Sequence, residues 1–127
     1  MNESIEFTGK LLLVGLFLWS GLLHKPTNFH AVGQELRRKS FPLAPFCAAS
    51  AIVLEIGGSA IVLLPSHTFA PWIYATALIA LAGYTMLTAV LFHDFWVLAG
   101  IDRVHQLASF LKNVGLTGAF LLLLARA

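Results

Sequence analysis

Four side chains that stand in or beside long apolar stretches have the chemistry to bind a ligand or to carry a proton: Glu55, His93, Lys112 and Asn113. Glu55 is the only residue with a formal charge between Lys39 and Asp94. A carboxylate inside an apolar run is costly in protein or in lipid unless it is neutralised or paired. We therefore expect Glu55 to face a polar partner.

The composition indicates what surrounds these side chains. Of the 127 residues, 58% are hydrophobic and 11% are charged, whereas roughly a quarter of the residues of a soluble domain are charged. The sequence therefore predicts one all-α membrane domain, residues 1–127, in contact with the lipid bilayer. The net charge of +2 comes from basic residues beside apolar runs, as membrane topology requires, so we expect no nucleic-acid partner.

Apolar runs near the length of a hydrocarbon core predict a bundle of four transmembrane helices. Their expected bounds are residues 7–24, 43–64, 70–93 and 105–125. In the first, Lys10 is expected to extend to the lipid headgroups. A cleaved signal peptide is the alternative for this first run, although no clear small-residue cleavage site follows it.

The longest polar connection, residues 25–42, holds four basic residues and is bracketed by two prolines. Phe29, Val32 and Leu36 recur at helical spacing, which predicts a short amphipathic helix lying in the membrane interface between the first and second spans. Its basic run would then touch anionic headgroups. A solvated basic loop is the alternative.

The distribution of Lys and Arg predicts the orientation of the spans. Five of these residues flank the connections after the first and third spans, and two lie near the other ends. The positive-inside rule therefore predicts that those connections are cytoplasmic and that both termini are periplasmic, in a bacterial cytoplasmic membrane.

In this topology Glu55 and Lys112 lie at similar depth, because each is two to three turns from the same membrane face. Small residues at helical spacing around both, such as Ala48 and Gly58 near Glu55, indicate faces that pack against other helices. Lys112 is therefore the expected partner of Glu55. Two interpretations stay open, a structural ion pair and a polar pocket that binds a ligand or passes protons.

Other chemistry has less support from the sequence. The single cysteine, Cys47, excludes dithiol–disulfide exchange within the chain. We expect no metal site because no short His-x-x-His or Cys-x-x-Cys spacing is present. A haem held by His24 and His93 is a weaker alternative, since each lies at the end of a span.

Four segments occur in a characteristic order: Trp19-Ser20-Gly21 followed by Lys25, Leu54-Glu55-Ile56-Gly57-Gly58, Phe92-His93-Asp94-Phe95-Trp96, and Gln106 to Leu124 with Phe110-Leu111-Lys112-Asn113. Together they resemble the DoxX family of small four-span membrane proteins. Lys10 departs from the family, which often has an arginine near the first span. The resemblance covers nearly the whole chain.

The resemblance implies a role in a membrane redox system that is linked to a quinone or to thiol and oxidative stress, with a partner redox protein. A quinone-like head group would then be held by residues in one half of the bundle. The candidates are Glu55, His93, Lys112, Asn113, Lys25, Trp96 and Trp19. The alternative is a non-enzymatic scaffold, anchor or assembly factor, and the glycines of the spans are compatible with a homo-oligomer.

Overall fold

The computed structural model describes residues 2–127, and these residues form helices and connections with no strand. The contacts divide the chain into two compact units, residues 1–77 and 78–127, and the boundary falls within one helix. Each unit is described by itself below. The prediction that the chain is a single domain stays a prediction.

The first unit begins with α1 (Glu3–Trp19), which continues through a π-helical turn, η1 (Ser20–His24), into α2 (Lys25–Thr27). The side chain of Asn2 caps α1 by accepting hydrogen bonds from the backbone N–H groups of Ser4 and Ile5, at 3.0 and 3.3 Å. Two acidic residues in the first turn add to this stabilisation of the helix start. The first span is therefore one helical rod with a widened turn near its end.

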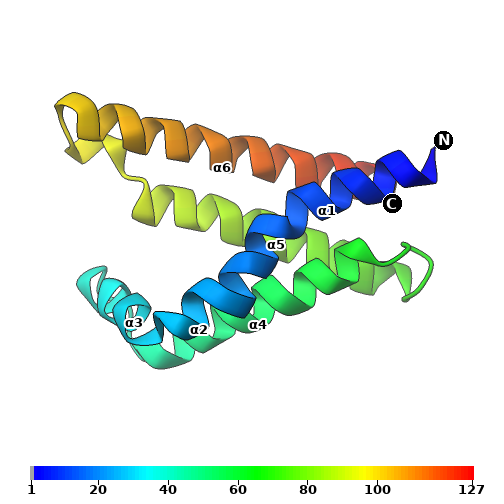
Figure 1. The fold of residues 1–127 in the computed structure, drawn as a ribbon, viewed down its shortest axis with the longest axis horizontal. Coiled ribbons are helices and arrows are strands. Elements are labelled where there is room, and N and C mark those ends of the chain that lie inside the picture. The colour runs from blue at the N-terminus through cyan, green and yellow to red at the C-terminus, as the bar shows by residue number, and fades with distance from the viewer. Residues whose placement is uncertain (1) are drawn as a thin grey trace. The chain divides into compact units, whose positions relative to one another are not determined.

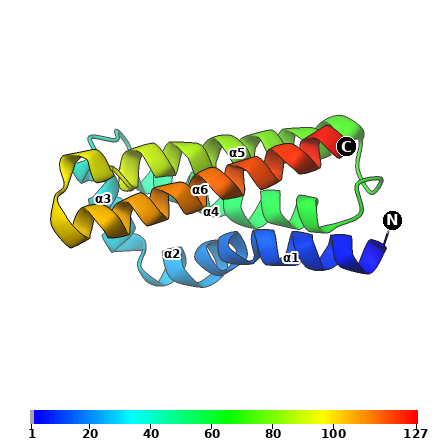
Figure 2. The same cartoon turned by 90° about the horizontal axis from the view of Figure 1, so that it is seen from above.

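The same unit continues with α3 (Phe29–Arg38) and α4 (Ala44–Leu63) and ends in the first turns of α5 (Pro71–Phe92). Both α1 and α3 contact α4, and α1 runs alongside it in both ribbon views (Figures 1 and 2). The buried apolar side chains of this unit are Val14, Phe17, Ala44, Ala48, Val62, Tyr74 and Ala77. The small residues on α4 allow the close approach of α1.

The second unit is a helical hairpin. It consists of the remainder of α5, the short 3-10 helix η2 (Phe95–Val97) and α6 (Gly100–Arg126). In Figures 1 and 2, α5 and α6 lie side by side and are joined through η2. Its buried apolar side chains are Leu78, Leu81, Ala82, Ala89 and Phe120.

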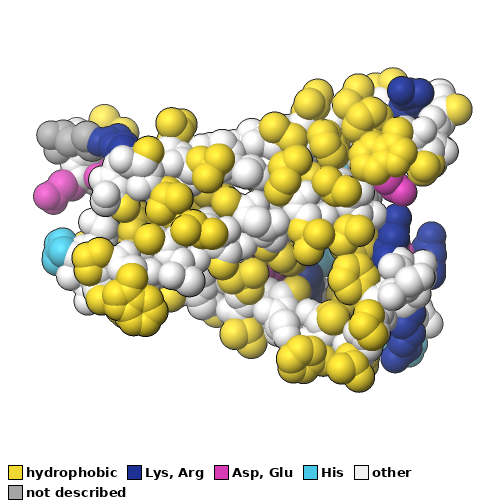
Figure 3. All heavy atoms as spheres, turned by 180° about the vertical axis from the view of Figure 1, so that it is seen from behind, with side chains coloured by type: hydrophobic (Ala, Val, Ile, Leu, Met, Phe, Trp, Pro, Cys, Tyr) yellow, Lys and Arg dark blue, Asp and Glu magenta, His cyan; other side chains and the backbone are white. Residues whose placement is uncertain are grey.

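Four helical stretches are long and apolar enough to cross a membrane. Their bounds are Glu3–Thr27, Ala44–Leu63, Pro71–Val97 and Gly100–Arg126. Large apolar side chains remain exposed on all four, for example Leu12 at 77%, Val53 at 70% and Leu122 at 70%. Figure 3 shows apolar side chains along the helices of the face that it draws, with Lys and Arg mainly at the ends. Such surfaces are suited to lipid contact.

The predicted all-α class and the four spanning helices are thus confirmed. The bounds of α4 and α5 lie within one residue of the expected 43–64 and 70–93. The last helix starts five residues earlier than expected, because the polar segment 100–104 forms its first turn. The predicted short helix between the first two spans is α3.

Candidate functional site

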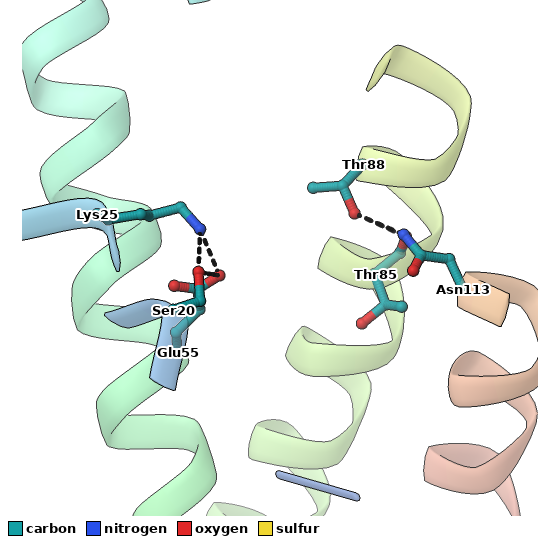
Figure 4. A network of polar contacts seen from close by, with 6 residues as sticks. All are labelled: Ser20, Lys25, Glu55, Thr85, Thr88 and Asn113. Carbon is teal, nitrogen blue, oxygen red and sulfur yellow. Dashed lines mark hydrogen bonds and ion pairs between the residues drawn. The ribbon is translucent and has the colours of Figure 1, made fainter. Parts of the chain in front are cut away.

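Glu55 lies in a buried polar cluster within the first unit. Nζ of Lys25 donates hydrogen bonds to Oε1 of Glu55 and to Oγ of Ser20, both at 2.7 Å. Oγ of Ser20 donates to the same carboxylate oxygen at 3.3 Å. Figure 4 shows the three side chains converging, with Glu55 on α4 and the other two on the first helical rod. We refer to them as the Ser20–Lys25–Glu55 cluster.

The cluster is a largely dehydrated ion pair. The side chain of Glu55 is 3% exposed and that of Lys25 is 15% exposed. In such surroundings the attraction between the two charges is strong, but it must offset the loss of hydration of both groups. The serine hydroxyl supplies one further hydrogen bond at the shared oxygen, which reduces that cost.

The π-helical turn η1 is what brings Lys25 to the cluster. In an ordinary α-helix two residues five apart point about 140° away from each other. Here the backbone N–H of Lys25 donates to the carbonyl of Ser20, five residues earlier, and the widened turn places both side chains on one side. The rings of Trp19 and His24, also five apart, stack with centroids 5.0 Å apart. Single π turns inside α-helices are frequent at functional sites.

Gly21 sets how closely this turn approaches α4. A Cβ atom at this position would lie 2.9 Å from Cγ1 of Ile56 and 3.1 Å from Cβ of Glu55. Only glycine fits such a gap without displacement of a neighbour. The glycine therefore fixes the short distance over which Ser20 and Lys25 reach the carboxylate.

Ser59 lies one turn beyond Glu55 on the same face of α4. Its side chain is fully buried, and its Oγ atom has no hydrogen-bond partner among the described residues. A buried hydroxyl without a partner is unusual in a folded protein. A water molecule or a polar group of a ligand at this place would supply the missing hydrogen bond.

A second buried cation lies in the first unit. Lys10 is 5% exposed, its Nζ lies 3.2 Å from a carboxylate oxygen of Glu6, and it stands 5.2 Å from the ring centroid of Tyr74. The expectation that Lys10 extends to the headgroups is therefore wrong. An anion one helical turn away and an aromatic face hold the ammonium inside the protein.

The second unit has its own polar contacts between α5 and α6. Nδ2 of Asn113 lies 3.3 Å from Oγ1 of Thr88 and 3.4 Å from the carbonyl of Thr85. Figure 4 shows the side chains of Asn113 and Thr88 pointing toward each other. Nδ1 of His93 lies 2.8 Å from Oε1 of Gln106. Because that amide oxygen only accepts, Nδ1 is the donor in this contact. Both contacts tie the two helices of the hairpin together.

Aromatic rings surround the turn of this hairpin. The rings of Phe95, Trp96 and Phe110 meet edge to face, with centroids between 5.3 and 6.1 Å apart. The guanidinium of Arg103 lies 5.9 Å from the ring centroid of Phe95. Trp96 is half exposed at 49%.

The predicted site residues thus fall into separate places. Lys25 and Glu55 share one cluster. Trp19 directly precedes Ser20 on the same helical rod, and its ring stacks on that of His24. The other four candidates, His93, Trp96, Lys112 and Asn113, belong to the second unit. The ionic partner of Glu55 in the first unit is Lys25, and pairing with Lys112, whose side chain is exposed, stays a prediction.

Sequence reasoning did not assign roles to Ser20 and Ser59, because neither the π turn nor a single unsatisfied hydroxyl has a signature in the sequence. Within residues 2–127, no three His, Cys, Asp or Glu side chains are grouped so as to hold a metal ion.

Comparison with known proteins gives one informative similarity. The chain is 27% identical to the inner membrane protein YphA of Escherichia coli (strain K12) over 114 residues, which are 90% of this chain and 76% of that protein. No family model matches the chain, so membership of the DoxX family is not confirmed. No solved structure matches it. The similarity and the four apolar helices support an integral inner-membrane protein.

Proposed function

We propose that this protein is a DoxX-like subunit of a redox system in the inner membrane, and that its Ser20–Lys25–Glu55 cluster binds the head group of a quinone-like molecule. The observation that carries the proposal is the buried hydroxyl of Ser59, which lies one turn from the charged pair and has no hydrogen-bond partner within residues 2–127. A carbonyl-bearing ligand that enters beside Lys25 would satisfy this hydroxyl and accept a hydrogen bond from the ammonium.

The three groups have the chemistry for this ligand. Reduction of a quinone to a quinol takes two electrons and two protons. Lys25 would donate a hydrogen bond to one quinone carbonyl and pass one of the two protons to that oxygen, and Glu55 would hold the proton that returns to Lys25. The second proton would come from water at the other quinone oxygen. The electrons come from a partner redox protein, since a single cysteine excludes a dithiol within this chain.

Access to the cluster is from the end of the first span. Lys25 keeps 15% of its side-chain surface exposed, whereas Glu55 keeps 3%. Trp19, which is 52% exposed, presents its ring beside the same π turn. A planar ring held by this indole and by the ammonium is the arrangement that the proposal requires.

A structural role for the cluster is the second candidate, and the contact at Gly21 favours it. The turn that carries Ser20 and Lys25 lies so close to α4 that a methyl group would not fit. In this interpretation the ion pair fixes the register of two helices in a membrane scaffold or assembly factor.

Quinone binding separates the two candidates. The protein is extracted in mild detergent, its lipid extract is analysed for quinones, and a short-chain ubiquinone analogue is titrated with Trp fluorescence as the signal. We expect co-purified quinone and saturable binding, which Glu55→Gln and Lys25→Met each weaken at least ten-fold, as loss of a buried charged hydrogen bond implies. Glu35→Gln, the same change at an exposed ion pair, is the matched control.

A structural cluster gives another result. The wild-type protein would then bind no quinone, and the two variants would lower its stability only. That outcome would replace the redox proposal by the scaffold.

A further inference from the structure

Three consecutive basic residues, Arg37, Arg38 and Lys39, end α3. The side chain of Arg38 is 77% exposed and shares an exposed ion pair with Glu35 at 2.9 Å, and Arg37 is also exposed. Figure 3 shows the basic side chains gathered over this end of the first unit, beside apolar ones. The end of α3 therefore carries a net positive charge, because Glu35 offsets only one of the three basic side chains.

The position of α3 in the chain fixes where these charges lie. α3 follows the first span and precedes the second, and its ten residues are too short to cross a membrane. It also contacts α4, which is the second span. We therefore expect the basic end of α3 to lie at the membrane surface, at the level of the lipid headgroups.

The backbone after α3 is folded into a tight turn. The N–H of Ser40 donates to the carbonyl of Arg37 at 2.9 Å, and the N–H of Phe41 donates to the carbonyl of Leu36 at 3.0 Å. Together with the positive φ of 65° at Ser40, these bonds form a Schellman motif. The motif directs the chain back toward α4 immediately after the basic residues.

Leu43, which begins α4, has two unusual properties. Its φ of 52° is in the left-handed region, which is costly for a leucine. Its side chain is 75% exposed, and Phe46, one turn later, is 69% exposed. The side chain of Leu43 therefore gains little from contacts within the protein that would offset the backbone strain. Both apolar groups are therefore available for contact with a lipid chain.

We propose that the connection between α3 and α4 is a binding site for an anionic phospholipid. Arg37 and Arg38 bind the phosphate of the headgroup, and Leu43 and Phe46 contact its acyl chains. A free phosphate ion would use only the basic residues, whereas a lipid uses both groups, and the exposed apolar side chains favour the lipid. The site is independent of the proposed quinone site.

The test is lipid binding by the full-length protein in detergent, measured by native mass spectrometry with phosphatidylglycerol or phosphatidylcholine of equal chain length. We expect tighter binding of phosphatidylglycerol. Arg37→Gln/Arg38→Gln should weaken it about 30-fold, since each basic residue near an anionic surface contributes roughly a five-fold factor. Arg103→Gln/Lys112→Gln removes the same charge from the second unit and should have little effect.

Leu43→Gly tests the apolar half of the site. Glycine adopts a positive φ without strain, so this variant should fold at least as well as the wild type, as judged by circular dichroism and thermal unfolding. We expect it to bind phosphatidylglycerol several-fold more weakly.

Three results would overturn the proposal: equal affinity for the two lipids, unchanged affinity in the arginine variant, or complete displacement of phosphatidylglycerol by inorganic phosphate with no effect of Leu43→Gly. The third would assign the basic residues to a free anion. Arg37→Lys/Arg38→Lys keeps the charge and should retain lipid selectivity, which distinguishes binding from a loss of folding in the glutamine variant.

Discussion

The ammonium of Lys25 lies 2.7 Å from Oε1 of Glu55, and the two residues are thirty positions apart in the chain. The contact depends on a widened helical turn, because Lys25 would point away from Ser20 in a regular α-helix. The first and second spans are thus joined by a buried charge pair that is set by backbone geometry as much as by residue type.

Removal of one member of this pair should destabilise the protein strongly. Glu55→Gln or Lys25→Met leaves a poorly hydrated group without its counter-charge, and we expect each to lower the free energy of unfolding by about 3 kcal/mol. The double variant should lose less than the sum of the two. Unfolding in mixed detergent micelles, followed by circular dichroism, measures all three.

Glu35→Gln is the control for this experiment, since it removes a carboxylate from the exposed pair with Arg38. It should change the free energy of unfolding by about 1 kcal/mol or less. If the effects of Glu55→Gln and Lys25→Met were additive in the variant that carries both, Lys25 and Glu55 would not interact.

Gly21→Ala should disturb the helix contact without removing a polar group. The added methyl would lie 2.9 Å from Cγ1 of Ile56, so we expect a loss of about 1–3 kcal/mol in stability from the displacement of neighbouring atoms. Gly15→Ala is the matched control in the same helix, because no atom lies within 4 Å of its added Cβ. That variant should be neutral or more stable by up to about 1 kcal/mol. Equal thermal stability of the two variants would contradict the close approach at Gly21.

Ser59→Ala should affect stability and ligand binding in opposite directions. No described residue forms a hydrogen bond with this buried hydroxyl, so its removal should raise the free energy of unfolding by about 1 kcal/mol. If the hydroxyl serves the proposed quinone, the same variant should bind the quinone analogue more weakly. Ser50→Ala, at an exposed position of α4, is the control for both measurements. A less stable Ser59→Ala variant would mean that the hydroxyl is satisfied in the folded protein.

The two lysines that were considered as partners of Glu55 should differ in coupling. We expect a larger interaction energy between Glu55 and Lys25 than between Glu55 and Lys112, because Lys25 is in contact and the side chain of Lys112 is exposed. Double-mutant cycles with Lys→Met and Glu55→Gln measure both energies. A larger value for Lys112 would restore the pairing that was predicted from the sequence.

The sequence was sufficient for the spans and for the expectation that Glu55 faces a polar partner, because long apolar runs and a lone carboxylate within one are strong physical signals. It did not identify the cationic partner. Helical periodicity assumes a constant number of residues per turn. The π turn at Ser20–His24 holds more residues, so Lys25 lies on a different face of the helix from the one that a regular α-helix predicts.

The burial of Lys10 was missed for a related reason. Snorkelling is the default for a lysine near the end of a span. Here Glu6 and the ring of Tyr74 provide a better local environment, and the contact with Tyr74 joins residues from separate helices. Pairings of this kind depend on tertiary structure and are not visible in local patterns.

The chain order of the Lys25–Glu55 pair affects how the protein is made. The span that carries the lysine is synthesised first, so a counter-ion is already in place when the helix with Glu55 enters the bilayer. Insertion of an unpaired charge at the centre of a span costs roughly 3 kcal/mol. We therefore expect the contact that joins the two helices in the folded protein also to lower the cost of inserting the second span.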